Sequence, residues 1–262
     1  MTDGLALARA YLAQQRLLGG GWVIRADAPA RPRPAVPPAR PPAATTAAPV
    51  APAAPPPLPP GLHWEPPVSA DLFTPDPVRD AGSLAAVAGL VAACTKCRLC
   101  ETRTHTVPGE GPADARLVVV GEGPGRTEDA TGRPFVGRAG ELLTKILGAI
   151  DLAREQVFIC NVVKCRPPDN RTPQQDEAAM CAPYLFRQIA LVHPKVILAL
   201  GGPAAQTLLN TRQSLGSLRG QVHRFRDIPV IVTYHPAALL RNPNWKKPTW
   251  DDVRIARRLL DD

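Results

Sequence analysis

Residues 116–125 read Arg116-Leu-Val-Val-Val-Gly-Glu-Gly-Pro-Gly125, an apolar run that ends in a glycine-rich loop. A short run without polar residues is typical of a strand buried on both faces of a parallel sheet. The glycines that follow let the backbone approach a flat ligand closely. Ligands of parallel α/β sheets lie beyond the carboxyl ends of the strands, so this loop predicts a ligand site.

The same pattern continues towards the C-terminus. Three more apolar runs, at 157–163, 195–200 and 229–234, alternate with segments of helical period. Strands that alternate with helices indicate a parallel sheet covered on both faces. We therefore predict an α/β fold, a three-layer αβα sandwich around four main parallel strands, with residues 222–225 as an added strand.

The N-terminal part of the chain has a different composition. Fourteen of the 32 prolines fall within residues 28–60, where the fixed φ and the missing amide donor of proline prevent helix and sheet. We predict a short amphipathic helix within residues 1–27, or a frayed, solvated one, and a disordered Pro/Ala-rich linker over 28–80. The globular domain is predicted to span residues 81–262, and a protein partner for residues 1–80 is left open.

The charge of the chain lies on the predicted globular domain. The whole chain carries a net charge of +8, and residues 81–262 hold 24 basic and 17 acidic side chains, a net charge of +7. This excess indicates a polyanionic partner. No apolar run reaches the ~18 residues of a transmembrane helix, and the N-terminus does not resemble a signal peptide. We expect a cytoplasmic monomer that does not bind membranes, with its thiols reduced.

The cysteines are spaced as metal ligands can be. Cys94 and Cys97 form a Cys-x-x-Cys pair, Cys100 extends it at the same spacing, and Cys165 and Cys181 follow later in the chain. The pair precedes the first strand, which disfavours a thioredoxin-like redox site. Four thiolates that meet in the fold would suit zinc or an iron–sulfur cluster, and spacing alone does not choose between these or unligated thiols. The sixth cysteine lies inside an apolar run and is predicted to be a core residue.

Polar and aromatic side chains cluster around the first two strand ends. Glu122 and Glu128 place carboxylates in and after the glycine-rich loop, and Phe135 lies between glycines, as a ligand-stacking ring or as a core residue. Asn161 lies near the end of the second apolar run. Its amide offers the donor and the acceptor that a nucleobase edge requires, although strand-end turns also use asparagine. A nucleotide-phosphate loop is disfavoured, because Pro124 removes an amide and the Gly-x-Gly-x-x-Gly spacing is absent.

The last strand run leads into His235, which is either structural or part of the site. Leu239, Leu240 and Arg241 follow it. Two apolar residues with an arginine on an exposed loop can wedge into a base stack, or they can begin a helix that packs on the sheet.

Together these motifs resemble family 4 uracil-DNA glycosylases, the iron–sulfur type of bacteria and archaea, over about residues 84–262. The segments that carry the resemblance are Gly121-Glu-Gly-Pro-Gly125, Gly132-Arg-Pro-Phe-Val-Gly-Arg-Ala-Gly140, Asn161-Val-Val-Lys-Cys-Arg-Pro-Pro168 and Tyr234-His-Pro-Ala-Ala-Leu-Leu-Arg-Asn-Pro243. The resemblance implies a four-stranded parallel sheet between helices. It also implies a structural 4Fe-4S cluster, with a redox-sensing role left open, on Cys94, Cys97, Cys165 and Cys181.

The resemblance implies a DNA repair enzyme that flips uracil out of DNA and hydrolyses its N-glycosidic bond. Phe135 would then stack on the base, and Asn161 would pair with the uracil edge and disfavour cytosine. His235 would donate a hydrogen bond to O2 as negative charge develops there. The backbone amides around Glu122 and Gly123 would contact the pyrimidine ring.

The remaining residues receive supporting roles from the same resemblance. Glu122 is the candidate that positions the attacking water, and Glu128 is expected near the base, where it would exclude the thymine methyl group. Leu239, Leu240 and Arg241 would fill the gap left by the flipped base. Residues 166–180 contain no histidine, which disfavours the related branch that traps the abasic sugar covalently. The alternative is a catalytically weak DNA-binding or polymerase-associated module of the same fold.

Overall fold

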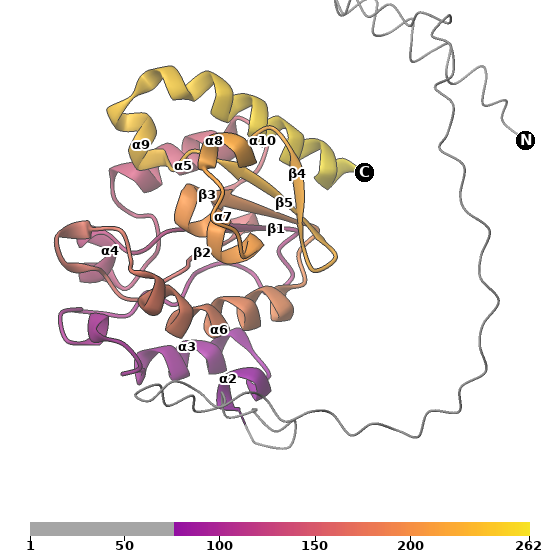
Figure 1. Ribbon diagram of the computed structural model, residues 1–262. Coiled ribbons are helices and arrows are strands. Elements are labelled where there is room, and N and C mark those ends of the chain that lie inside the picture. Colours follow the sequence, from indigo (N-terminus) through magenta and orange to yellow (C-terminus); the bar gives the residue numbers. More distant parts are fainter. Residues whose placement is uncertain (1–75) are drawn as a thin grey trace, which may run out of the picture. The chain divides into compact units, whose positions relative to one another are not determined.

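The computed structural model describes residues 76–262 (Figure 1). The helix predicted within residues 1–27 and most of the predicted linker lie outside the described residues. Helix α2 (Pro77–Asp80) is capped by Asp76, whose carboxylate accepts a hydrogen bond from the Val78 amide (2.9 Å). Val78 is buried in the core. The described fold therefore includes α2, which directly precedes Ala81.

The centre of the fold is a sheet with the strand order β2-β1-β3-β5-β4. The strands are β1 (Leu117–Gly121), β2 (Phe158–Asn161), β3 (Val196–Leu200), β4 (Val222–Phe225) and β5 (Ile228–Thr233). The first four in the spatial order are parallel, which confirms the predicted α/β fold. The sheet has a fifth strand besides the four parallel ones, and this strand, β4, covers the residues predicted as an added strand. β4 pairs antiparallel with β5 because a tight turn with a positive φ at Arg226 joins them as a hairpin.

Helices cover both faces of the sheet (Figure 1). They are α3 (Leu84–Ala92), α4 (Arg126–Thr131), α5 (Arg138–Gly148), α6 (Gln175–Val192), α7 (Gly202–Leu209), α8 (Leu215–Leu218), α9 (Pro236–Arg241) and α10 (Lys246–Asp261), with short 3₁₀ turns η1 (Arg98–Cys100), η2 (Arg154–Gln156), η3 (Pro168–Asn170) and η4 (Pro243–Trp245). None of the helices in the described part of the chain is long and apolar enough to cross a membrane.

Two cores separate the layers. Val118 and Val120 of β1 pack into one core with α3, α6 and α7, whereas Leu117 and Val119 pack into the other with α5 and α10. This alternation follows from the two-residue period of a strand, whose successive side chains point to opposite faces. Cys160 of β2 is buried in the first core, so its prediction as a core residue is confirmed.

The register of the sheet brings the strand-end loops together. Gly121 at the end of β1 lies opposite Asn161 at the end of β2. β5 ends at Thr233, two residues before His235. Because these strands are parallel, the segments that follow them all leave the same edge of the sheet.

Candidate active site

A cavity of about 380 Å³ lies at the carboxyl edge of the sheet. Most of the predicted site residues line it, namely Glu122, Gly123, Glu128, Phe135, Asn161, His235 and Arg241. They come from the end of β2 and from the segments that follow β1 and β5, as the strand-end rule predicted. Asn170, Arg171 and Thr172, from the segment between β2 and α6, complete the wall.

Phe135 is held in a strained conformation at the wall of the cavity. Its φ is +51°, in the left-handed region that bulky residues avoid. The Arg154 guanidinium donates a hydrogen bond to the Phe135 carbonyl (3.0 Å). A Cβ at Gly140 would overlap that carbonyl, and a Cβ at Gly121 would overlap the Phe135 ring. The ring faces the His235 imidazole, with centroids 5.5 Å apart and planes tilted by 32°. Several neighbours therefore maintain one orientation of the ring.

Glu128 braces the loops that carry Phe135. One carboxylate oxygen accepts hydrogen bonds from the Val136 and Gly137 amides (2.9 and 2.8 Å), and the other accepts one from the Gly125 amide (3.1 Å). The carboxylate thus ties the glycine-rich loop to the phenylalanine loop. In this arrangement it acts through the backbone around Phe135.

Asn161 lines the cavity and carries an unsatisfied acceptor. The residue is 1% exposed, and its Oδ1 is buried without a hydrogen-bond partner among the described residues. The buried Lys164 ammonium fixes the Asn161 backbone by donating to its carbonyl (2.8 Å), and it also donates to Gln188 Oε1 (2.6 Å). An unsatisfied buried acceptor costs ~1–3 kcal/mol. Such an atom on a cavity wall indicates a ligand that supplies the donor.

His235 caps the N-terminus of α9 and is fixed in one tautomer. Its Nδ1 accepts a hydrogen bond from the Ala237 amide (3.2 Å). The proton of a neutral imidazole must then lie on Nε2. Burial, together with the charge of Arg241, lowers the pKa of His235 to about 4, and the charge of Glu128 opposes that shift. The imidazole is therefore neutral at pH 7 and has one N–H to donate.

Glu122 lies in the same cavity with its charge partly desolvated. Burial raises the pKa of Glu122 above its ordinary value, while a hydrogen bond from the Thr172 side chain and the charge of Arg241 oppose that rise. A desolvated carboxylate beside a single cation is a stronger base than one in water.

The three residues after His235 do not share one environment. They belong to α9, which packs against α5. Leu239 is 1% exposed and contributes to the core, so its expected contact with DNA is corrected; it is a packing residue. Leu240 is 41% exposed, and Arg241 is exposed and lines the cavity. The segment thus forms a helix that packs on the fold, and only Leu240 and Arg241 of the three residues are exposed.

A second cavity lies between η1, α6 and the segment after β2. Five cysteines line it: Cys94, Cys97, Cys100, Cys165 and Cys181. Within residues 76–262, no three His, Cys, Asp or Glu side chains are arranged to hold a single metal ion. A four-iron cluster takes one thiolate on each iron, so its sulfur ligands stand farther apart than those around one ion.

Cationic and amide donors surround these sulfurs. The Arg103 guanidinium donates to Cys165 Sγ (3.1 Å) and to the Cys94 carbonyl (2.9 Å), and the Lys164 amide donates to Cys181 Sγ (3.3 Å). Burial raises the pKa of the Cys181 thiol to about 11. Hydrogen bonds to sulfur are a regular feature of iron–sulfur sites, so the donor set fits a cluster.

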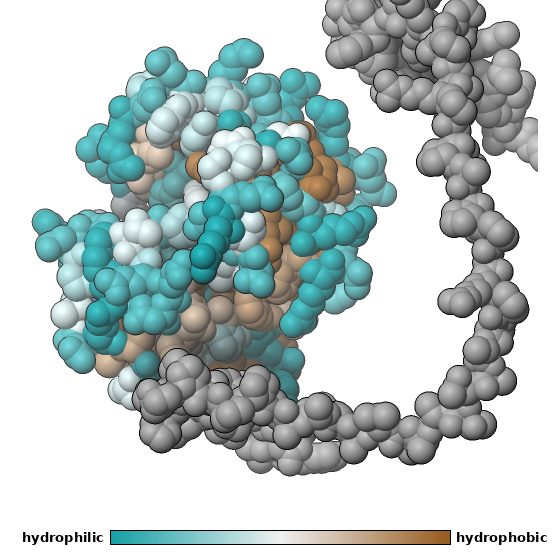
Figure 2. Space-filling view, in the orientation of Figure 1, coloured by the Kyte–Doolittle hydropathy of each residue, from teal (hydrophilic) through white to brown (hydrophobic). Residues whose placement is uncertain are grey.

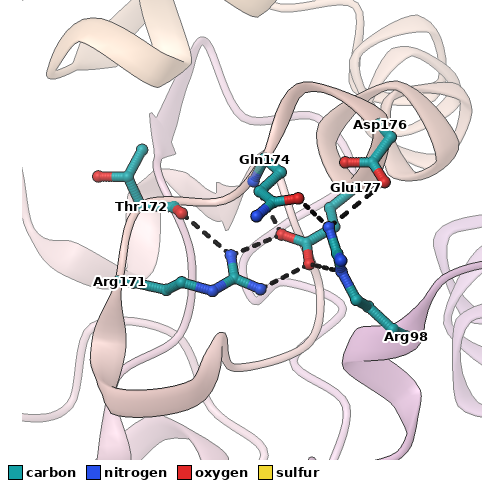
Figure 3. Close-up of polar contacts among 6 residues, drawn as sticks. All are labelled: Arg98, Arg171, Thr172, Gln174, Asp176 and Glu177. Atoms are coloured by element: carbon teal, nitrogen blue, oxygen red, sulfur yellow. Dashed lines mark hydrogen bonds and ion pairs between the residues drawn. The ribbon is translucent and has the colours of Figure 1, made fainter.

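An ion-pair network joins the cysteine segment to the wall of the first cavity (Figure 3). Glu177, on the first turn of α6, is fully buried. It accepts hydrogen bonds from Arg98, which directly follows Cys97 (2.8 Å), and from both terminal nitrogens of Arg171, which lines the first cavity (2.8 and 2.7 Å). These two arginines and a hydrogen bond from the Gln174 amide hold the pKa of Glu177 at about 2, with Arg171 the largest cause.

The family model for the uracil DNA glycosylase superfamily matches residues 108–255, more than half of the chain. The chain belongs to this superfamily. It is 50% identical over 174 residues to a type-4 uracil-DNA glycosylase of Thermotoga maritima, covering 65% of this chain and 91% of that protein. It is 47% identical over 178 residues to a type-4 uracil-DNA glycosylase of Sulfurisphaera tokodaii, covering 64% and 81%. The resemblance to family 4 is thus confirmed.

The superfamily match includes the whole first cavity and ends within α10. Sequence reasoning missed several residues that support this uracil-DNA glycosylase fold, among them Arg154, Lys164 and Glu177. Glu177 alone had a local signal, because a glutamate three residues after Gln174 fits a helix capping box. The partners of the other two are set by tertiary contacts.

Proposed function

We propose that this protein is a DNA repair enzyme that flips uracil out of DNA and hydrolyses its N-glycosidic bond, which releases free uracil and leaves an abasic site. The unsatisfied Oδ1 of Asn161, in a cavity that also holds the Phe135 and His235 rings, carries the proposal. Relatives named type-4 uracil-DNA glycosylases support it.

Recognition of the base follows from the chemistry of the Asn161 amide. Its Oδ1 accepts the N3–H of uracil, and its amino group donates to the O4 of the base. Cytosine has no proton on N3 and presents an amino donor in place of O4, so the same amide meets it with two mismatches. Phe135 stacks on the flipped ring and excludes water from one face of it.

His235 and Glu122 act on the reacting atoms. As the bond between C1′ and N1 breaks, its electron pair moves onto uracil and the sugar becomes an oxocarbenium ion. The Nε2–H of neutral His235 donates to uracil O2, where the negative charge gathers. Glu122 orients a water for attack on C1′ and accepts its proton, and its charge stabilises the cationic sugar.

Cys94, Cys97, Cys165 and Cys181 are proposed to hold a 4Fe-4S cluster, with Cys100 as an unligated neighbour. The donors to Cys165 and Cys181 support this assignment. The cluster would tie the segment before β1 to α6 and has no step in the hydrolysis. Uracil-containing DNA is the proposed partner, in agreement with the +7 charge of residues 81–262. A cytoplasmic location and a monomeric state are proposed with it.

The test uses the full chain purified without oxygen. It is incubated with single-stranded and duplex oligonucleotides that contain one uracil. Free uracil together with alkali-labile sites is the expected result. Tight binding of the oligonucleotide without release of uracil would indicate a DNA-binding module instead of an enzyme. Iron and sulfide near four per chain are expected, whereas stoichiometric zinc in a colourless protein would contradict the cluster.

A further inference from the structure

An exposed aromatic residue follows the helix that carries Arg241 of the cavity wall, and it has no part in the proposed reaction. Trp245, the last residue of η4, is 37% exposed. Its indole stacks on the ring of Tyr234, with centroids 4.7 Å apart and planes within 4° of parallel. Tyr234 directly precedes His235, and Arg241 on the cavity wall precedes Trp245 by four residues. Both rings of the stack are thus close in the chain to residues that line the cavity.

The stack is supported from its inner side. The Arg219 guanidinium lies 4.2 Å from the centroid of the Tyr234 ring. Trp245 covers one face of that ring, so Arg219 must lie on the other. The buried Asp252 accepts two hydrogen bonds from Arg219 (2.8 and 2.6 Å), and the Pro248 carbonyl accepts a third (2.6 Å). Each layer is thus fixed by the next, and Trp245 loses little conformational freedom when a ligand stacks on it.

Exposed cationic residues flank Trp245 in the chain. Arg241, Lys246 and Lys247 are exposed within six residues of one another. Neither lysine forms an ion pair with any residue from 76 to 262. The surface over α9 and the start of α10 is largely hydrophilic in Figure 2. Unpaired cations beside a fixed aromatic ring suit a ligand with negative charges and flat rings.

We propose that Trp245 is a stacking platform for an unpaired base next to the flipped uracil, with Lys246 and Lys247 contacting the adjoining phosphates. The inference rests on the proposed function and adds a preference to it. In a duplex, neighbouring bases stack on one another, so their faces are free only where the helix is opened. In single-stranded DNA every base can offer a face. The platform therefore favours single-stranded substrate.

The test measures binding of a uracil-free single-stranded oligonucleotide by fluorescence anisotropy. Trp245→Ala should weaken binding about tenfold, because stacking on an aromatic ring contributes roughly that much per base. Trp245→Phe should restore most of the loss. Trp250→Ala is the matched control: Trp250 is 39% exposed on α10 and makes no ring contact within the described residues. It should bind within about twofold of the unsubstituted protein.

Salt dependence separates the two kinds of contact. Lys246→Ala should lower the slope of log K against log salt by about one, and Trp245→Ala should leave it unchanged. Quenching of indole fluorescence by the oligonucleotide should be lost in Trp245→Phe and kept in Trp250→Phe. This readout needs no change in affinity, and it applies if the alanine variant fails to fold.

Three results would overturn the platform: unchanged affinity in Trp245→Ala, an equal loss in Trp250→Ala, or an equal loss with uracil-free duplex. The last would indicate a general duplex contact. Because the probe contains no uracil, these results do not depend on glycosidic cleavage. A protein that binds through Trp245 but releases no uracil would contradict the proposed function alone.

Discussion

The two cavities of this fold are built in opposite ways. The first holds groups in costly states: a left-handed Phe135, an unsatisfied Asn161 oxygen and a desolvated Glu122. Around the cysteines, the charged and polar groups are paired, as Arg103 with Cys165 and Glu177 with two arginines show. Strain and unpaired atoms persist where a ligand will satisfy them, whereas saturated contacts stabilise the fold. We therefore assign the chemistry to the first cavity and the structural role to the second.

The largest effect on the fold is expected from the cysteine cavity. Cys165→Ser should lose iron and the visible absorbance of the cluster, and its free energy of unfolding should fall by more than about 3 kcal/mol, because metal binding contributes directly to folding. Cys100→Ser is the control, since Cys100 lines the same cavity without a proposed iron ligand role. Full iron content in Cys165→Ser, or loss of iron in Cys100→Ser, would change the ligand assignment.

A smaller loss of stability is expected at the link between the two cavities. Glu177→Gln leaves Arg98 and Arg171 without their carboxylate. Breaking a buried ion pair costs ~3–5 kcal/mol, and we expect about 2 kcal/mol because the two arginines are 49% and 34% exposed. Asp261→Asn, which removes an exposed ion pair on α10, should change stability by less than about 0.5 kcal/mol.

The pH dependence of the stability difference between wild type and Glu177→Gln gives a second check of the buried ion pair. The pKa of Glu177 is lowered from 4.5 to about 2, chiefly by Arg171. Its stabilisation is complete above pH 4.5 and is lost as the pH falls towards 2. Urea unfolding at pH 6 and pH 3.5 should therefore show a wider gap between wild type and Glu177→Gln at pH 6. A gap that is equal at both values would contradict the buried ion pair.

The geometry of the first cavity can be disturbed without touching a reacting group. Gly140→Ala places a Cβ against the Phe135 carbonyl and forces the loop to move. We expect a single-turnover rate about tenfold lower, because small misplacements of binding groups are expensive in catalysis. Gly148→Ala lies on the same helix with open space at its Cβ. Gly148→Ala should retain the wild-type rate. Equal rates in the two variants would contradict a role of the Phe135 position in catalysis.

The smallest expected effect is that the His235 imidazole stays neutral between pH 8 and pH 5.5. Burial and Arg241 lower the pKa of His235 to about 4. Between pH 8 and pH 5.5 its imidazole nitrogens should therefore show the neutral Nε2–H form by nitrogen NMR, with half-protonation only near pH 4. The resonance is assigned by its disappearance in His235→Gln. A midpoint near 6.5 would show that the site does not desolvate the ring.

The sequence predicted those parts of the molecule that depend on local pattern and topology. Apolar runs located β1, β2, β3 and β5, and the parallel order then placed Phe135, Asn161 and His235 at one edge. This succeeded because the carboxyl ends of parallel strands converge. The pattern also predicted β4 as an added strand, but its antiparallel pairing at the edge of the sheet depends on the hairpin turn at Arg226.

Tertiary contacts decided what sequence reading could not. Leu239 and Leu240 are adjacent and chemically alike, and only the way α9 packs on α5 buries one and exposes the other. Arg98 and Glu177 are 79 positions apart in the chain, so no local spacing relates them. The tautomer and low pKa of His235 likewise depend on its helix cap and its burial.

The assignment of the chemistry to the first cavity and of a structural role to the second is tested most directly by the single-turnover rate of uracil release. This rate is measured with excess enzyme on a uracil-containing oligonucleotide. Removal of an aligned donor from a charged transition state typically lowers the rate by ~10²–10³-fold. We predict such a loss for His235→Ala and for Asn161→Ala, with iron content and unfolding free energy close to those of wild type. Wild-type rates in both variants would contradict the assignment of the first cavity as the uracil site.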